Sequence, residues 1–228
     1  MGRQRRMTSI DHRPYLQPVR DQGERGTCLA FSATCAHEHA RLQLEEQDEL
    51  CIETLYWAAA QRMPRRTRSE EGLTIDAALS ALEEHGQSTE DTWPYRAVRH
   101  ANDAELAPPQ SAVESLRKAG GRTIDPTPTS VREQLASGHV IVLGIRLWGA
   151  FSTADPATIT IAPPSRGEVS QYGHAIVAVG CDDAGRLLLR NSWGVSWGSS
   201  GYAWADEQFL ATAAICAAVI DGPVPMAA

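Results

Sequence analysis

The spacing of apolar residues changes about halfway along the chain. In the first part, apolar residues recur at three- and four-residue steps, which predicts helices over 27–46, 52–61 and 75–85. Beyond Gly138 the apolar runs are short and rich in branched side chains, which predicts strands. These strands are expected over residues 140–143, 158–161, 175–179, 187–189, 201–204 and 215–220. Helices followed by strands indicate an α+β fold with two segregated halves and a cleft between them.

The segments between these elements carry their own signals. Residues 107–128 contain four prolines and a Gly-Gly pair, which predicts a connector and not a packed element. Ser130 with Glu133 fits a capping box and predicts a short helix that ends before Gly138. Residues 182–185 read Asp-Asp-Ala-Gly between two predicted strands, which indicates a hairpin.

Composition narrows the classes of partner. The formal net charge of −7 argues against a general nucleic-acid binder, which usually carries a basic face. No stretch approaches the roughly 18 apolar residues that a membrane span needs. Residues 1–10 are basic and polar and lack the apolar region of a signal peptide. We therefore expect no nucleic acid and no membrane as partner, and a cytoplasmic location.

The metal-ligating residue types are scattered. Five cysteines are widely spaced and form no C-x-x-C pair, which argues against a structural zinc site. His37 and His39 lie two residues apart on a predicted helix and point to different faces, so they are expected at the helix surface or partly buried. The sequence therefore predicts no metal site and no cofactor.

Cys28 stands at a position that suits a reactive thiol. It follows Thr27, a plausible helix N-cap, and the electropositive helix N-terminus stabilises an anion such as a thiolate. The competing interpretation is a small buried apolar residue, which is what most free cysteines are. Taken alone, Cys28 leaves both interpretations open.

Three separate segments resolve that choice. Residues 22–32 read QGERGTCLAFS, residues 172–180 read YGHAIVAVG, and residues 189–198 read LRNSWGVSWG, followed by Gly-Tyr. In this order they resemble the nucleophile, histidine and asparagine segments of the papain family of cysteine peptidases. His174 lies 146 residues after Cys28, within the window of about 130–150 typical of that family, and Asn191 lies slightly past it.

The resemblance implies a fold and a division of the chain. It implies a bacterial-type papain-like peptidase with a helical left half, an antiparallel β-barrel-like right half and an active-site cleft between them. We expect one unit over 1–228, with 21–115 forming the helical half and 116–228 plus 1–20 forming the strand half.

The resemblance also implies catalytic roles. Cys28 would be the nucleophile, and His174 would take its proton and later protonate the leaving amine. Asn191 would accept the other ring N–H of His174 and orient the imidazole. The side-chain amide of Gln22 and the backbone N–H of Cys28 would donate to the developing oxyanion.

Substrate-binding residues are carried over in the same way. Residues 70–73 resemble the loop that holds an extended peptide, with Gly72 and Leu73 as the contacts, and Gly173 would offer its carbonyl to the same peptide. Trp193 is also expected among the substrate-binding residues. It would cover the Asn191–His174 hydrogen bond and exclude water. A hydrophobic side chain two residues before the cut is expected, because the predicted pocket residues are apolar: Leu73, Ile75, Leu143 and Ala175.

Two departures from the family pattern bear on location and control. Arg25 stands where the family has a cysteine three residues before the nucleophile, so the disulfide at that point is absent, which suits a reducing compartment. Only 27 residues precede Cys28, too few for the family's inhibitory prodomain. We expect a narrow substrate range, a partner protein or compartment to restrain activity instead.

Three functions stay open at this point. The leading one is an endopeptidase or exopeptidase that hydrolyses peptide bonds through a thioester acyl-enzyme. A ligase or transamidase would pass the same acyl group to an amine. A catalytically silent module would keep only the peptide-binding surface. The expected partners are a peptide or protein substrate and a regulatory or inhibitor protein.

Overall fold

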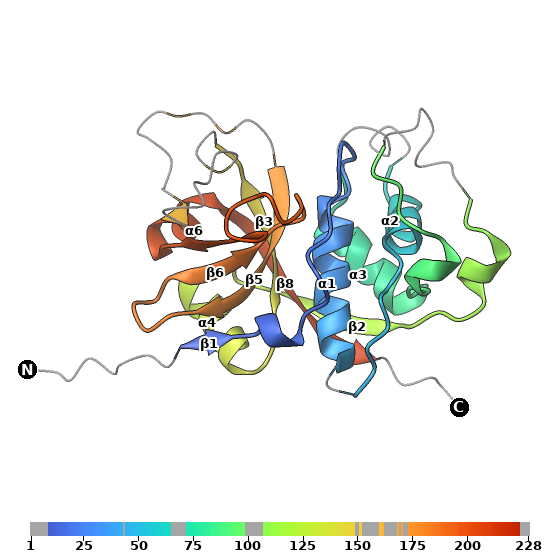
Figure 1. Cartoon of the computed structure of the whole chain (residues 1–228), viewed down its shortest axis with the longest axis horizontal. Helices are drawn as coiled ribbons and strands as arrows, with labels where there is room; N and C mark the ends of the chain where they lie inside the picture. Colours follow the sequence, from blue (N-terminus) through green and yellow to red (C-terminus); the bar gives the residue numbers. More distant parts are fainter. Residues whose placement is uncertain are drawn as a thin grey trace, which may run out of the picture.

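The computed structural model describes residues 9–42, 44–64, 72–98, 107–148, 151, 160–161, 168, 170 and 173–223. Helices α1 (Cys28–Leu42), α2 (Ile52–Ala60) and α3 (Ile75–Glu84) gather on one side of the molecule and most strands gather on the other (Figure 1). The three predicted helices are confirmed, although α1 ends earlier than expected. Helix α1 lies at the boundary between the two halves and packs against β3, β5 and β8.

The strands form one continuous sheet. Its members are β1 (Ile10–Asp11), β2 (Ala119–Ile124), β3 (Ile141–Arg146), β4 (Thr160–Ile161), β5 (Gly173–Cys181), β6 (Leu187–Arg190), β7 (Tyr202–Ala205) and β8 (Ala214–Pro223). They follow the order β2-β8-β3-β5-β6-β7-β4, and β1 pairs with β5. All pairs are antiparallel except that of β4 with β7. Among the described residues the sheet is an open path, so the β-rich half is curved sheet without a closed barrel.

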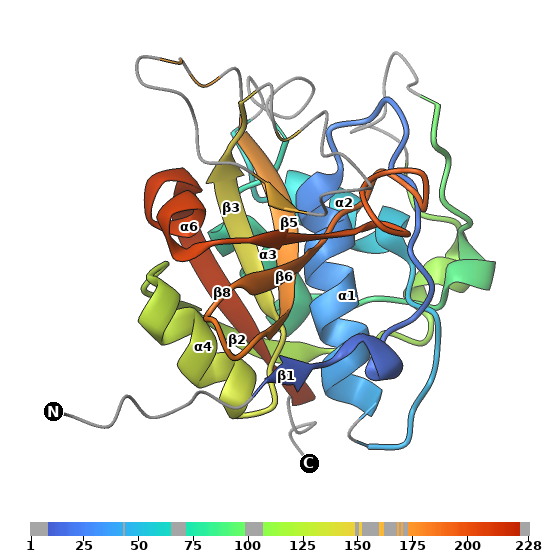
Figure 2. The same ribbon diagram turned by 60° about the vertical axis from the view of Figure 1, so that its left-hand side comes forward.

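The sheet separates two apolar cores. Helices α4 (Pro128–Ala136) and α6 (Glu207–Ala213) cover one face, and α1 covers the other (Figure 2). Strand β3 alternates between them, because successive side chains of a strand point to opposite faces. Leu143 joins the core under α4 and α6, whereas Val142 joins the core under α1. The prediction that Leu143 lines a pocket beside the nucleophile is therefore wrong.

The predicted connector over 107–128 is also wrong. It holds the 3-10 helix η5 (Gln110–Val113) and strand β2, which pairs with β8. A Cβ at Gly121 would lie 2.7 Å from Cδ2 of Leu79 and 2.9 Å from the carbonyl oxygen of Val219. The glycine that suggested a loop is what lets β2 fit between α3 and β8.

Two helix starts differ from the sequence prediction. Helix α4 begins at Pro128, and its cap is Thr127, whose Oγ1 accepts the Ser130 N–H at 3.2 Å. Helix α6 was not predicted; Asp206 caps it by accepting the Phe209 N–H at 2.7 Å. Within the described ranges, 3-10 helices also occur at η1 (Arg13–Tyr15) and η3 (Glu90–Thr92). The hairpin between β5 and β6 is confirmed.

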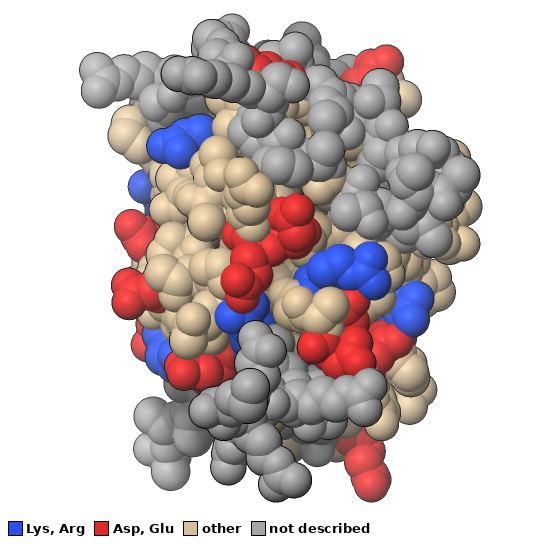
Figure 3. Space-filling model, turned by 90° about the vertical axis from the view of Figure 1, so that its left-hand side faces the viewer, with Lys and Arg blue, Asp and Glu red and all other residues tan. Residues whose placement is uncertain are grey.

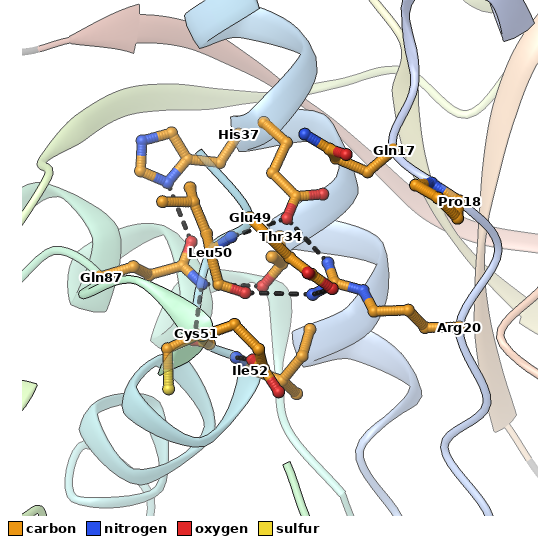
Figure 4. A network of polar contacts seen from close by, with 12 residues as sticks. Gln17, Pro18, Arg20, Thr34, His37, Glu49, Leu50, Cys51, Ile52 and Gln87 are labelled. Atoms are coloured by element: carbon orange, nitrogen blue, oxygen red, sulfur yellow. Dashed lines mark hydrogen bonds and ion pairs between the residues drawn. The ribbon is translucent and has the colours of Figure 1, made fainter. Parts of the chain in front are cut away.

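His37 and His39 are fully buried, whereas a position at the helix surface or a partly buried one was expected. His37 Nδ1 donates to Oε1 of Gln87 at 2.8 Å, because the Gln87 amide nitrogen already donates to Thr34 and to the carbonyl of Cys51 (Figure 4). Burial lowers the pKa of His37 to about 4, so its imidazole is neutral at pH 7. Helix α1 is thus tied to the start of α2 and to the segment around Gln87 by a buried polar network.

On the face drawn in Figure 3, acidic and basic side chains are interspersed among the described residues. No three His, Cys, Asp or Glu side chains of the described residues are grouped so that they could hold a metal ion. No helix within the described ranges combines the length and the apolar character that crossing a membrane requires.

Candidate active site

Cys28 is the first residue of α1. The carbonyl of Thr27 accepts the Phe31 N–H at 3.0 Å and so begins the helix. Burial raises the pKa of the Cys28 thiol, and the nearby backbone N–H groups of Ala175, Leu29 and Cys28 oppose that shift. Part of the side chain stays exposed. Cys28 packs against the apolar cluster that includes Ala175 of β5, the residue that directly follows His174.

His174 and Asn191 come from neighbouring strands. His174 is the second residue of β5 and pairs with Ile145 of β3, and Asn191 directly follows β6. Nε2 of His174 lies 2.8 Å from Oδ1 of Asn191. Burial lowers the pKa of His174 to about 4, and the hydrogen bond to Asn191 opposes that shift. The β3–β5 ladder holds the His174 backbone, and a hydrogen bond from the Asn191 N–H to the carbonyl of Gly201 at 3.0 Å holds that of Asn191, directly after the β5–β6 pair Val177–Arg190.

Aromatic rings enclose the imidazole. The Trp193 ring lies 4.8 Å from the His174 ring, centroid to centroid, and the Phe151 ring lies 5.9 Å from it. Phe151 also packs edge-on against Trp193 at 5.6 Å, and its carbonyl accepts the Trp197 indole N–H at 3.1 Å. Apolar rings strengthen the hydrogen bond that they shield from water. Sequence reasoning missed Phe151, because no motif marks its segment.

Gln22 is fixed on three sides. Its backbone N–H donates to the carbonyl of Ser192 at 2.8 Å, and its Oε1 accepts the Ser192 hydroxyl at 2.7 Å. Its Nε2 donates one N–H to the carbonyl of Arg25 at 2.8 Å. An amide carries two such hydrogens, and the second has no partner among the described residues. The contact from Ser192 was not predicted, although Ser192 lies inside the asparagine motif.

The loop between Gln22 and Cys28 is stabilised by a hydroxyl relay. The Tyr95 hydroxyl donates to the carbonyl of Gln22 at 2.8 Å, so it accepts from the Thr27 hydroxyl at 2.7 Å. Gly23 adopts φ +59°, and a Cβ there would lie 2.5 Å from the carbonyl oxygen of Ala97. Only glycine fits this turn, which brings Gln22 toward the start of α1.

The predicted substrate-binding residues fall in two places. Gly72 lies beside the nucleophile loop, with its Cα 3.8 Å from where a Cβ of Gly26 would stand. Gly173 is exposed at the start of β5. Residues 70 and 71 lie outside the described residues. One apolar cluster packs around Cys28 and includes Leu73, Ile75, Ala175 and Cys216.

Comparisons with known proteins agree with this arrangement. The family model for papain family cysteine proteases matches residues 7–218. An uncharacterized peptidase C1-like protein of Acanthamoeba polyphaga mimivirus is 26% identical over 196 residues, covering 80% of this chain and 62% of the relative. Cysteine proteinase 3 of Entamoeba histolytica is 26% identical over 200 residues, covering 85% and 61%. The chain thus spans less than two thirds of the length of these relatives.

Solved structures share the fold. Xylellain, a cysteine protease from Xylella fastidiosa, superposes with a TM-score of 0.84 at 21% identity, covering 95% of this chain and 86% of that one. The Carica candamarcensis cysteine protease CMS1MS2 superposes with a TM-score of 0.71 at 21% identity, covering 95% and 99%. The motifs, the fold and the match over most of the sequence lead to one assignment: the chain belongs to the papain family of cysteine proteases.

Proposed function

We propose that this protein hydrolyses peptide bonds through a thioester formed on Cys28. One observation carries the proposal. Cys28, the first residue of α1, packs against the same apolar cluster as Ala175, the residue after His174, and His174 Nε2 is held by Asn191. A thiol at a helix N-terminus beside an oriented imidazole is the arrangement that nucleophilic catalysis by cysteine requires.

The first step forms the bond between sulfur and the substrate carbonyl carbon. Because Nε2 of His174 donates to Asn191, Nδ1 is the nitrogen left to take the Cys28 proton. The carbonyl π electrons move to the oxygen, which becomes an oxyanion. The second Nε2 hydrogen of Gln22 and the backbone N–H of Cys28 would donate to that oxygen; losing one such donor typically lowers kcat by about 10²–10³-fold.

The second step releases the amine and then the acid. The C–N bond breaks as His174 gives its proton to the leaving nitrogen, which leaves a thioester on Cys28. Water then attacks the thioester carbon while His174 takes a proton from it. The C–S bond breaks, the carboxylic acid departs and the proton returns to the Cys28–His174 pair.

The protonation of the resting pair depends on a balance. Burial raises the pKa of the Cys28 thiol and lowers that of His174 to about 4, so burial favours the neutral pair. The N–H groups around the sulfur and the oxygen of Asn191 favour the charged pair. A thiolate paired with an imidazolium therefore depends on these N–H groups and on the Asn191 oxygen. His174 serves as the proton acceptor in either state.

The substrate we propose is an extended peptide that would contact Gly72, beside the nucleophile loop, and Gly173, at the start of β5. A hydrophobic side chain two residues before the cut would pack against Leu73 and Ala175, which belong to the apolar cluster around Cys28. Trp193 would cap the other side, next to His174.

We also propose a reducing compartment such as the cytoplasm as the place of action. All five cysteines are free thiols. Unpaired cysteines are typical of proteins that stay in a reducing environment. A regulatory or inhibitor protein is a further proposed partner.

Peptide-library cleavage, read by mass spectrometry, tests the proposal. The wild-type protein should release products with new carboxyl termini and a preference for hydrophobic residues two positions before the cut. The Cys28→Ala variant should keep its fold and lose essentially all turnover. Cleavage that survives in Cys28→Ala would refute the mechanism, and joined peptides in place of hydrolysed ones would point to acyl transfer.

A further inference from the structure

Arg25 and Glu53 form a buried ion pair directly behind the loop that carries Gln22. Both side chains are nearly inaccessible, at 2% and 4%. Nη1 of Arg25 donates to Oε1 of Glu53, and Nη2 donates to Oε2 at 2.9 Å. The two planar groups therefore meet through two parallel hydrogen bonds, which fixes orientation as well as distance.

Further contacts surround this pair. Nη1 of Arg25 also donates to the carbonyl of Arg96 at 2.8 Å, and the Arg96 N–H donates to Glu53 at 3.1 Å. The Arg25 guanidinium lies over the rings of Tyr95 at 4.9 Å and Tyr56 at 5.3 Å. Glu53 is in the first turn of α2, where the helix dipole favours a carboxylate. One side chain thus joins the nucleophile loop to α2 and to residues 95–96.

The backbone of Arg25 connects this pair to the site. Its carbonyl accepts both the side-chain N–H of Gln22 and the backbone N–H of Thr27, each at 2.8 Å. The same carbonyl therefore contacts both the Gln22 amide and Thr27, the residue directly before α1. A shift of the Arg25 backbone would move one proposed oxyanion donor relative to the other.

We propose that Arg25, held by Glu53, is a positioning residue for the oxyanion donor Gln22. It acts through Gln22 and touches no reacting atom. The proposal rests on the peptidase function proposed above, and the bidentate geometry predicts that lysine, a point charge without a planar fork, cannot replace arginine here.

The test compares two reactions of Cys28 in the wild type and in Arg25→Lys. Peptide hydrolysis places charge on a carbonyl oxygen, whereas alkylation by iodoacetamide displaces iodide and places none there. Hydrolysis kcat should fall about 10–100-fold in Arg25→Lys, with KM changed little. Inhibition by a peptide aldehyde, whose adduct carries the same oxyanion, should weaken by a similar factor. The alkylation rate should stay within about twofold of wild type.

Two further variants keep the test decisive. Gln22→Ala combined with Arg25→Lys should be no slower than Gln22→Ala alone, because Arg25 acts through Gln22. If Arg25→Lys fails to fold, Arg25→Met with Glu53→Leu removes both buried charges, and apolar replacements of this kind are often tolerated. That double variant should show the same selective loss of hydrolysis. Arg13→Lys, in the exposed bidentate pair with Asp11 at the far end of β5, is the matched control.

The outcomes separate cleanly. Three results would each overturn the positioning role. The first is an Arg25→Lys variant with the kcat of the wild type. The others are an equal loss of hydrolysis and alkylation, and effects of Arg25→Lys and Gln22→Ala that multiply. Absence of hydrolysis in the wild type would instead overturn the proposed peptidase function.

Discussion

The two sides of the proposed site are built in different ways. The strand wall, residues 173–193, carries His174 on β5 and Asn191 directly after β6, next to the Val177–Arg190 pair of the β5–β6 ladder. The loop wall, residues 22–28, belongs to no strand, and only Asp21, directly before it, forms an isolated bridge with Trp193. Side chains stabilise it instead, chiefly Arg25 and Tyr95.

This difference indicates which changes each wall tolerates. A ladder uses backbone groups that every residue carries, so the strand wall keeps its geometry when side chains outside the core change. The loop wall depends on particular side-chain partners, so a single substitution can displace Gln22. We therefore expect substitutions in the strand wall to alter chemistry and substitutions in the loop wall to alter geometry.

The largest effect is expected from the strand wall. His174→Ala should lower kcat for peptide hydrolysis by about 10⁴-fold, because the general base and acid are lost. Iodoacetamide alkylation of Cys28 should then require pH values above the ordinary thiol pKa, since burial raises the pKa of that thiol. In the wild type, alkylation should stay appreciable near pH 7. Identical pH profiles for the two proteins would show that His174 accepts no proton from Cys28.

Behind the loop wall, the buried network around His37 should make stability depend on pH. Its pKa is about 4 in the folded protein and 6.5 in the unfolded chain, so the unfolded state binds more protons between these values. The free energy of unfolding should fall as pH drops from about 6.5 to about 4, and His37 should contribute about 3 kcal/mol of that fall. Urea unfolding of wild type and His37→Gln at several pH values measures it. Equal slopes in both proteins would be inconsistent with this assignment.

Glycine substitutions sharpen the comparison further. Gly23→Ala should destabilise the protein by about 2 kcal/mol, because φ +59° is strained for alanine and the new Cβ would clash with Ala97. Gly222→Ala in β8 is the matched control. Its φ of +99° is also strained, but its Cβ would meet no described atom within 4 Å, so about 1 kcal/mol is expected. Thermal unfolding compares them, and an equal loss would mean that the loop contact is unimportant.

The smallest effect is expected where the two walls touch. Ser192→Ala removes the hydroxyl that holds Oε1 of Gln22 and should lower kcat about tenfold, less than full loss of an oxyanion donor. Ser196→Ala, an exposed serine of the same motif, is the control and should leave kcat unchanged. Steady-state kinetics on one peptide suffices. A loss of more than 10³-fold would mean that Ser192 has a direct role in the chemistry.

The sequence predicted the helices that have a regular apolar period and the candidate site residues that lie in known motifs. Apolar periodicity located α1, α2 and α3, and the motifs gave Cys28, His174 and Asn191 as the candidate catalytic residues. Side chains along β3 alternate between the two faces of the sheet, and Leu143 lies on the face opposite to the one predicted. Gly121 suggested a loop in the sequence. Its close packing against α3 arises only in the folded protein, so no local pattern could reveal it.

The missing site residues have the same explanation. Phe151, Tyr95 and the Arg25–Glu53 pair act through partners distant in sequence, and no local pattern reveals such a pairing. Local rules describe what one segment prefers, whereas these contacts arise only when two segments meet. The loop wall, which depends on them most, was accordingly the less predictable of the two.

Trapping the acyl-enzyme tests the nucleophilic role of Cys28 most directly. The wild-type protein is mixed with an activated peptide ester, quenched with acid within milliseconds to seconds and analysed by intact-mass and peptide-mapping spectrometry. We predict an added mass equal to the acyl group, located on Cys28, that disappears as product accumulates and is absent from Cys28→Ala. Turnover of the same ester without any adduct on Cys28, or with the adduct on another residue, would contradict the account.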